Sequence, residues 1–117
     1  MGEIIPREPI PDNLKNIIYK TLDELNVKVN ERQELSSLFS LAWNDGFKEG
    51  YYGNEEYTKN LLPMIDWVLD RIKLEEEKEQ KVRNLIAYIL KQGYILGGKR
   101  KNEDEKVYGK RKRQPQI

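Results

Sequence analysis

The sequence predicts an all-α protein: a small bundle of three to four helices with one long C-terminal helix, followed by a disordered basic tail. Apolar residues recur at intervals of three and four over most of the chain, which is the spacing of amphipathic helices. Hydrophobic residues make up 38% and charged residues 35% of the 117 residues, a balance that suits helices with wide solvated faces. A chain of this length is typical of one domain with a modest core.

Three segments differ in composition. Residues 1–11 hold three prolines, which fix φ and remove backbone donors, so we expect an extended Pro-rich arm or, equally, a frayed terminus. Residues 12–98 carry the periodic apolar residues and form the helical domain. Residues 99–117 have few apolar groups and are expected to form a flexible basic tail.

The first two helices have clear starting signals. Asp12 can cap a helix of about residues 13–26, in which the apolar residues stand at helical spacing: Leu14, Ile17, Ile18, Leu22 and Leu25. Asn30 opens a capping-box pattern with Gln33, and we expect the second helix to begin there.

The second helix reaches the glycine-rich segment "WNDGFKEGYYGN", for which two interpretations stand. The helix ends at Trp43, because Asn-Asp-Gly is a strong turn signal, or it continues to about Tyr51. Two glycines in a continuing helix cost about 2 kcal/mol relative to alanine. We favour continuation, because the apolar period persists and because the segment then presents a stripe of small residues to a neighbouring helix: Ala42, Gly46 and Gly50.

The C-terminal half of the domain predicts one long helix. Asn54 or Asn60 caps its start, and residues 61–92 then form a single helix about 48 Å long. The apolar stripe lapses in the charged run of residues 73–81, so the alternative is a helical hairpin that turns there. Gly93 and the pair Gly97 and Gly98 are helix stop signals.

The charge of the chain is unevenly distributed. Residues 1–90 carry 12 Lys/Arg and 17 Asp/Glu, a net charge of −5, whereas residues 91–117 carry 9 and 3, a net charge of +6. Two basic clusters flank three acidic residues, Glu103, Asp104 and Glu105, and we predict that both clusters bind nucleic acid through its phosphates: Lys99, Arg100, Lys101, Lys110, Arg111, Lys112 and Arg113. A nuclear-import signal and a merely solvated tail are the alternatives; whether DNA or RNA is bound stays open.

Aromatic residues gather in residues 43–57. The candidate partner-binding residues are Trp43, Phe47, Tyr51 and Tyr52, because Trp and Tyr are frequent in binding hot spots. Their helical spacing equally indicates core packing. A protein-interaction module, an adaptor or inhibitor, is therefore the alternative to the nucleic-acid hypothesis.

Several chemistries find no support. The chain has no Cys and no His, which removes thiolate sites and the commonest general base and metal ligand. Asp66 and Asp70 stand at i,i+4 but opposite the apolar face, where carboxylates are usually solvated. We therefore expect a non-enzymatic accessory or regulatory protein without metal or cofactor, cytoplasmic rather than membrane-bound. Because a helix longer than its bundle exposes apolar surface, we also expect a homodimer.

Overall fold

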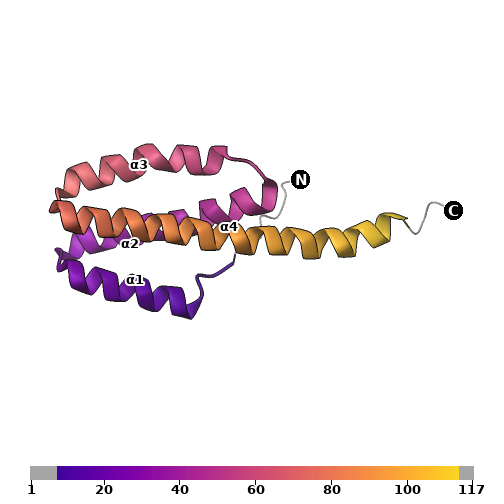
Figure 1. Ribbon diagram of the computed structural model, residues 1–117, viewed down its shortest axis with the longest axis horizontal. Coiled ribbons are helices and arrows are strands. Elements are labelled where there is room, and N and C mark those ends of the chain that lie inside the picture. Colours follow the sequence, from indigo (N-terminus) through magenta and orange to yellow (C-terminus); the bar gives the residue numbers. More distant parts are fainter. Residues whose placement is uncertain (1–7, 114–117) are drawn as a thin grey trace.

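The computed structural model describes residues 8–113, with side chains described as far as residue 106. Within these residues the protein is all-helical and has no strand, which confirms the predicted fold class. The four helices are α1 (Asp12–Leu25), α2 (Val29–Tyr52), α3 (Glu56–Ile72) and α4 (Glu76–Arg113) (Figure 1).

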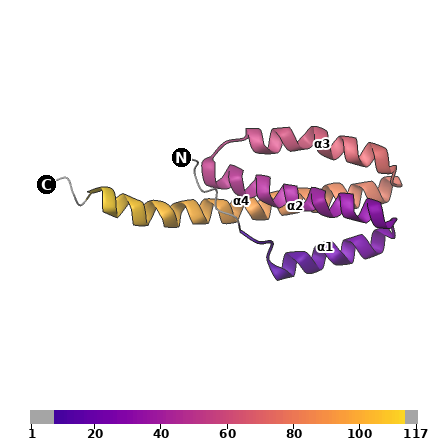
Figure 2. The same cartoon turned by 180° about the vertical axis from the view of Figure 1, so that it is seen from behind.

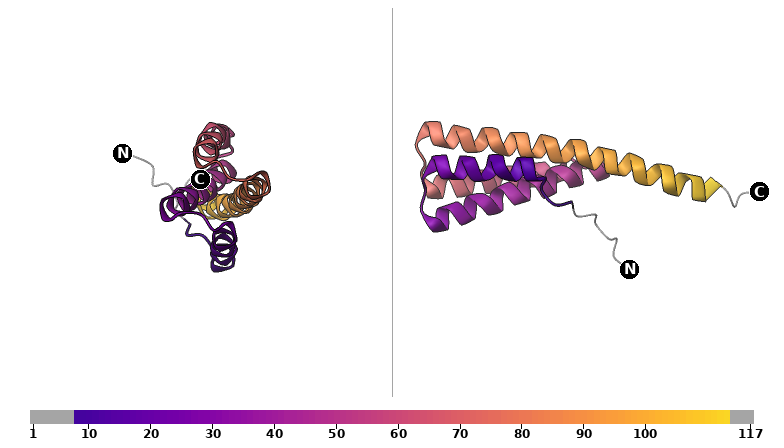
Figure 3. Two further views of the ribbon diagram at one scale, coloured as in Figure 1. Left: turned by 90° about the vertical axis from the view of Figure 1, so that its left-hand side faces the viewer. Right: turned by 90° about the horizontal axis from the view of Figure 1, so that it is seen from below.

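Consecutive helices run in opposite directions, so that α2 and α4 are parallel (Figure 1). These two helices lie side by side, with α1 and α3 on opposite sides of the pair; the reverse view and the end-on view show the same arrangement (Figure 2, Figure 3). The molecule measures 64 by 27 by 23 Å and is elongated because α4 extends past the end of α2.

The core lies around the α2–α4 pair. Both helices turn their apolar faces inward, and α1 and α3 each add one stripe of apolar residues to that core. The largest fully buried side chains are Trp43 and Phe39, and no polar or charged side chain of the described part is buried. The burial pattern explains the helical spacing of the apolar residues in the sequence.

Four glycines set the distance between α2 and α4. A Cβ atom placed on Gly46 would lie 2.5 Å from the carbonyl oxygen of Leu90, and one on Gly50 would lie 2.1 Å from that of Tyr94. From the other side, a Cβ on Gly93 would lie 2.8 Å from the carbonyl oxygen of Trp43. Gly97 faces Phe47 in the same way, at 2.2 Å.

The close approach of the two backbones confirms that α2 continues through the turn signal and that its small residues accept another helix. No larger residue fits at these four positions, because real Cβ atoms are not found so close to backbone oxygens. The contacts between the two backbones offset the low helix propensity of the glycines.

The prediction of one helix over residues 61–92 is wrong, and the alternative hairpin is correct. The break comes at Lys73, which adopts the left-handed conformation at φ 56° and donates its N–H to the carbonyl of Leu69 at 3.1 Å. Leu74 follows and packs against the core. A lysine thus makes a turn for which glycine is the usual signal, and the packing of Leu74 helps to hold it.

The predicted end of the C-terminal helix is also wrong. Gly93, Gly97 and Gly98 lie inside α4, which continues to Arg113, so that residues 99–113 extend the helix instead of following it. The reason is the packing of Gly93 and Gly97 on α2. Among the helix starts, α3 begins at Glu56, whose N–H donates to the Asn54 side chain at 3.0 Å. Asn54 and not Asn60 is therefore the starting signal.

Candidate nucleic-acid interface

The side of α4 turned away from α2 carries lysines in helical register. Lys91, Lys99 and Lys106 follow one another at intervals of eight and seven residues, which places them on one side of the helix. All three are exposed. Among the described side chains, none of the three has a carboxylate within 4.0 Å. Their charges are therefore available to an external anion.

Two exposed tyrosines stand near these lysines on α4. Tyr88 is 45% exposed and Tyr94 is 53% exposed. Proteins that bind single-stranded nucleic acid often combine lysines with exposed aromatic rings, because the rings stack on bases while the cations neutralise phosphates.

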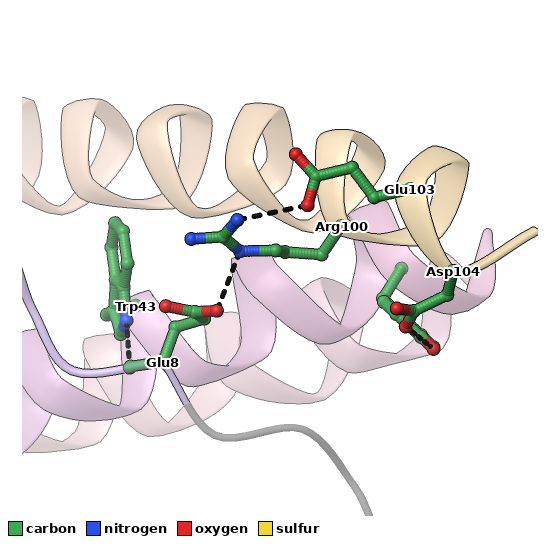
Figure 4. A network of polar contacts seen from close by, with 6 residues as sticks. Glu8, Trp43, Arg100, Glu103 and Asp104 are labelled. Carbon is green, nitrogen blue, oxygen red and sulfur yellow. Dashed lines mark hydrogen bonds and ion pairs between the residues drawn. The ribbon is translucent and has the colours of Figure 1, made fainter. Parts of the chain in front are cut away.

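The three acidic residues of the segment each have an intramolecular partner. Glu103 accepts a hydrogen bond from Arg100 at 3.1 Å, and Glu105 lies 4.0 Å from the Lys101 ammonium. Asp104 accepts a hydrogen bond from the Tyr51 hydroxyl of α2 at 2.5 Å (Figure 4). None of these partners is Lys99 or Lys106, so the acidic residues do not compete for those two cations.

Arg100 is bound within the molecule. Its guanidinium donates to Glu8 at 2.7 Å as well as to Glu103, and the carbonyl of Glu8 accepts a hydrogen bond from the Trp43 indole at 2.8 Å (Figure 4). These hydrogen bonds, to Glu103 first and Glu8 second, raise the pKa of Arg100 above its ordinary value. Arg100 was predicted to bind nucleic acid, but in the structure it fastens the N-terminal arm to α4.

The other predicted basic residues divide into two groups. Lys99 is exposed, and Lys101 is half-buried beside Glu105. The second cluster falls in the last helical turns of α4, and its side chains lie outside the described residues: Lys110, Arg111, Lys112 and Arg113. Tyr108, between the clusters, has its side chain outside them as well.

Sequence reasoning missed Lys91 and Lys106, which stand outside the basic clusters. Their spacing from Lys99 was a usable signal, but only for a helix that continues through Gly97 and Gly98. The assumed end of the helix at those glycines concealed the shared face.

The aromatic segment of residues 43–57 splits between core and surface. Trp43 and Phe47 are only 2% and 3% exposed, so they pack the bundle and present no surface to a partner. Tyr51 and Tyr52 are half-buried, and their rings meet edge to face at 5.0 Å. The ring of Tyr57 lies next to that of Tyr52, with 6.3 Å between the two ring centroids.

Other kinds of site are not seen in the described part of the chain. No three acidic residues there lie close enough together to hold a metal ion. Asp66 pairs with Arg83 at 2.9 Å, and Asp70 is exposed. None of the helices, over the residues described, is both long and apolar enough to cross a membrane.

Comparison of the chain with protein-family models, with curated proteins and with solved structures found no match.

Proposed function

We propose that this is a non-enzymatic accessory or regulatory protein that binds nucleic acid through the exposed side of α4. Lys91, Lys99 and Lys106 bind phosphates, and the basic residues 110–113 extend the contact. The observation that carries the proposal is the set of three exposed lysines without a described ion pair on one side of a helix that reaches beyond the bundle.

The geometry suits contact with a phosphate backbone. Lys99 and Lys106 are separated by two helical turns, about 10 Å along the axis. Lys91 and Lys106 are about 22 Å apart by the same measure, a distance that spans several phosphates of one strand. A helix holds these charges in place, so that binding does not require the ordering of a flexible tail.

The test is a fluorescence-anisotropy titration with labelled single-stranded and double-stranded DNA and RNA at several salt concentrations. The Lys99→Gln/Lys106→Gln variant removes two phosphate contacts, so the slope of log K against log salt falls by about two. Lys15→Gln/Lys20→Gln is the matched control, since both lysines are exposed on α1 and also lack a described ion pair. An equal loss in both variants, or no binding by the unmodified protein, would overturn the proposal.

A truncation after Lys106 tests the contribution of residues 110–113. This truncation keeps the ion pair of Arg100 with Glu8 and the hydrogen bond of Asp104 with Tyr51, so that the bundle retains its described contacts. Binding that weakens further on truncation supports a part for the second basic cluster. Unchanged binding would confine the interface to the described lysines.

The protein-interaction alternative has less support, because Trp43 and Phe47 are buried and only part of the aromatic segment faces outward. We also propose that the protein is a homodimer. The exposed face of α4 is the surface that we assign to the contact between the two copies.

A further inference from the structure

Among the glycines of α4 that the structure describes, Gly98 has no packing reason within the monomer. Gly46, Gly50, Gly93 and Gly97 each lie against a neighbouring backbone, but a Cβ atom on Gly98 would meet nothing within 4 Å. Glycine in a helix interior is unfavourable unless something approaches it closely. The position is surrounded by open space on the side of α4 that faces away from α2.

Gly98 belongs to a regular row of outward-facing residues. The row advances by four and three residues in turn, the interval of a coiled-coil seam, and consists of Asn84, Tyr88, Lys91, Ile95, Gly98 and Asn102. Tyr88 and Ile95 are both 45% exposed, and the other members are exposed or half-exposed. In the end-on view α4 stands at the edge of the bundle, where another helix has access to it (Figure 3).

Most of the row is complementary to itself when it is reversed; its central pair, Lys91 against Ile95, packs only through the alkyl stem of the lysine. If two copies of α4 are laid antiparallel about a point beside Gly93, Tyr88 of one copy meets Gly98 of the other, a large side chain over a small one. Asn84 then meets Asn102, so that the two amides can exchange hydrogen bonds.

Charge complementarity continues the pattern at both ends of the row. In the same register Lys81 of one copy faces Glu105 of the other. Among the described side chains of the monomer, Lys81 pairs with Glu24 at 3.8 Å and Glu105 with Lys101 at 4.0 Å, and both ion pairs are long and exposed. A parallel pair in register would instead place Lys81 against Lys81 and Glu105 against Glu105, which repel each other. The antiparallel arrangement repeats each favourable pair twice, as a two-fold axis requires.

We infer that a second copy of this chain covers this face, forming a two-fold dimer through antiparallel α4 helices. The inference names the interface of the dimer proposed above and does not depend on nucleic-acid binding. Lys91 and Tyr88 belong to the row, so a second copy and nucleic acid compete for these two residues. Lys99 and Lys106 lie beside the row and not in it, so their charges remain accessible at the edge of the dimer. The polar residues of the row set the register and orientation, at some loss of affinity.

Sedimentation equilibrium of the full chain without nucleic acid, over about a hundredfold range of concentration, tests the dimer. Tyr88→Ala weakens association about tenfold, whereas Tyr19→Ala, which removes an exposed tyrosine from α1, leaves it unchanged. Gly98→Ala weakens association as well but raises the melting temperature of the dilute monomer, because the new Cβ meets no atom there. A protein that stays monomeric throughout, or equal effects of the two tyrosine variants, would overturn the inference.

Cysteine crosslinking tests the orientation of the two α4 helices. The chain has no native cysteine, so only the introduced thiols can form disulfides. Chains with Asn84→Cys are mixed with chains carrying Asn102→Cys under mild oxidation. The antiparallel dimer gives mixed disulfides in excess over self-disulfides, and Lys20→Cys on α1 is the background control. Self-disulfides in excess, or crosslinking at the background level, would contradict the antiparallel arrangement. Because neither assay contains nucleic acid, failure here is separate from failure of the anisotropy experiment.

Discussion

The neighbouring glycines 97 and 98 give a sharp test of the α2–α4 interface, because the same substitution has opposite effects at the two positions. A Cβ on residue 97 would lie 2.2 Å from the carbonyl oxygen of Phe47 and 2.9 Å from the amide nitrogen of Tyr51. Both atoms belong to the backbone of α2, so no side chain can turn aside. One helix must move by most of an ångström, and α2 and α4 then lose contact along their length.

The magnitudes can be worked out from these distances. Alanine in place of glycine adds about 1 kcal/mol of helix stability at either position. Overpacking against backbone costs about 3 kcal/mol at residue 97 and nothing at residue 98. Gly97→Ala is therefore less stable than the unmodified protein by about 2 kcal/mol, and Gly98→Ala is more stable by about 1 kcal/mol.

Urea denaturation followed by circular dichroism measures both variants, at a protein concentration low enough to keep the chain monomeric. The expected difference between them, about 3 kcal/mol, is several times the usual error of such measurements. Equal stability of the two variants would refute the close approach of the helices. A gain in stability for Gly97→Ala would do so more strongly, because it would show that residue 97 faces open space.

Three further substitutions probe other parts of the structure. Lys73→Gly relieves the left-handed conformation between α3 and α4 and raises the unfolding free energy by about 0.5 kcal/mol; a loss of stability would contradict this conformation. Burial raises the pKa of the Asp45 carboxyl, and the charge of Lys48 partly offsets this rise. The native chain therefore binds the proton of Asp45 more tightly than the unfolded chain does, and the protein loses stability as pH rises through the raised pKa. Asp45→Asn therefore raises the melting temperature at neutral pH and has no such effect near about pH 3, below the ordinary pKa; an effect independent of pH would refute this reasoning. Trp43→Phe removes the hydrogen bond to Glu8 and leaves a cavity in the core, so it lowers the unfolding free energy by about 2 kcal/mol, which urea denaturation would measure; unchanged stability would contradict both the burial of Trp43 and its contact with the arm.

The sequence was sufficient for the helical class and for the first two helices. Apolar spacing predicted α1 to within a residue, and the persistence of that spacing through Phe47 and Tyr51 correctly outweighed a turn signal. Local patterns succeed there because each helix buries one face, and burial imposes the period that the sequence displays.

The two errors in α3 and α4 share a cause. Lys73 makes a turn without a turn residue, and Gly93 and Gly97 continue a helix that their propensity opposes. Packing decides the conformation in both places: Leu74 packs against the core next to Lys73, and Gly93 and Gly97 pack on α2. Packing between distant segments cannot be read from local propensity. The same limit concealed the shared face of Lys91 and Lys106, and the binding of Arg100 to Glu8 across the chain.

The pairing of α2 with α4 has a consequence for the order in which the protein folds. The glycine contacts join residues 44 and 50 positions apart, with α3 between them, so a long loop must close before the interface forms. During synthesis α2 is complete long before its main neighbour exists. The apolar side chains of Trp43 and Phe47 therefore stay exposed to solvent until α4 has been synthesised. The domain can fold as a unit only after that point.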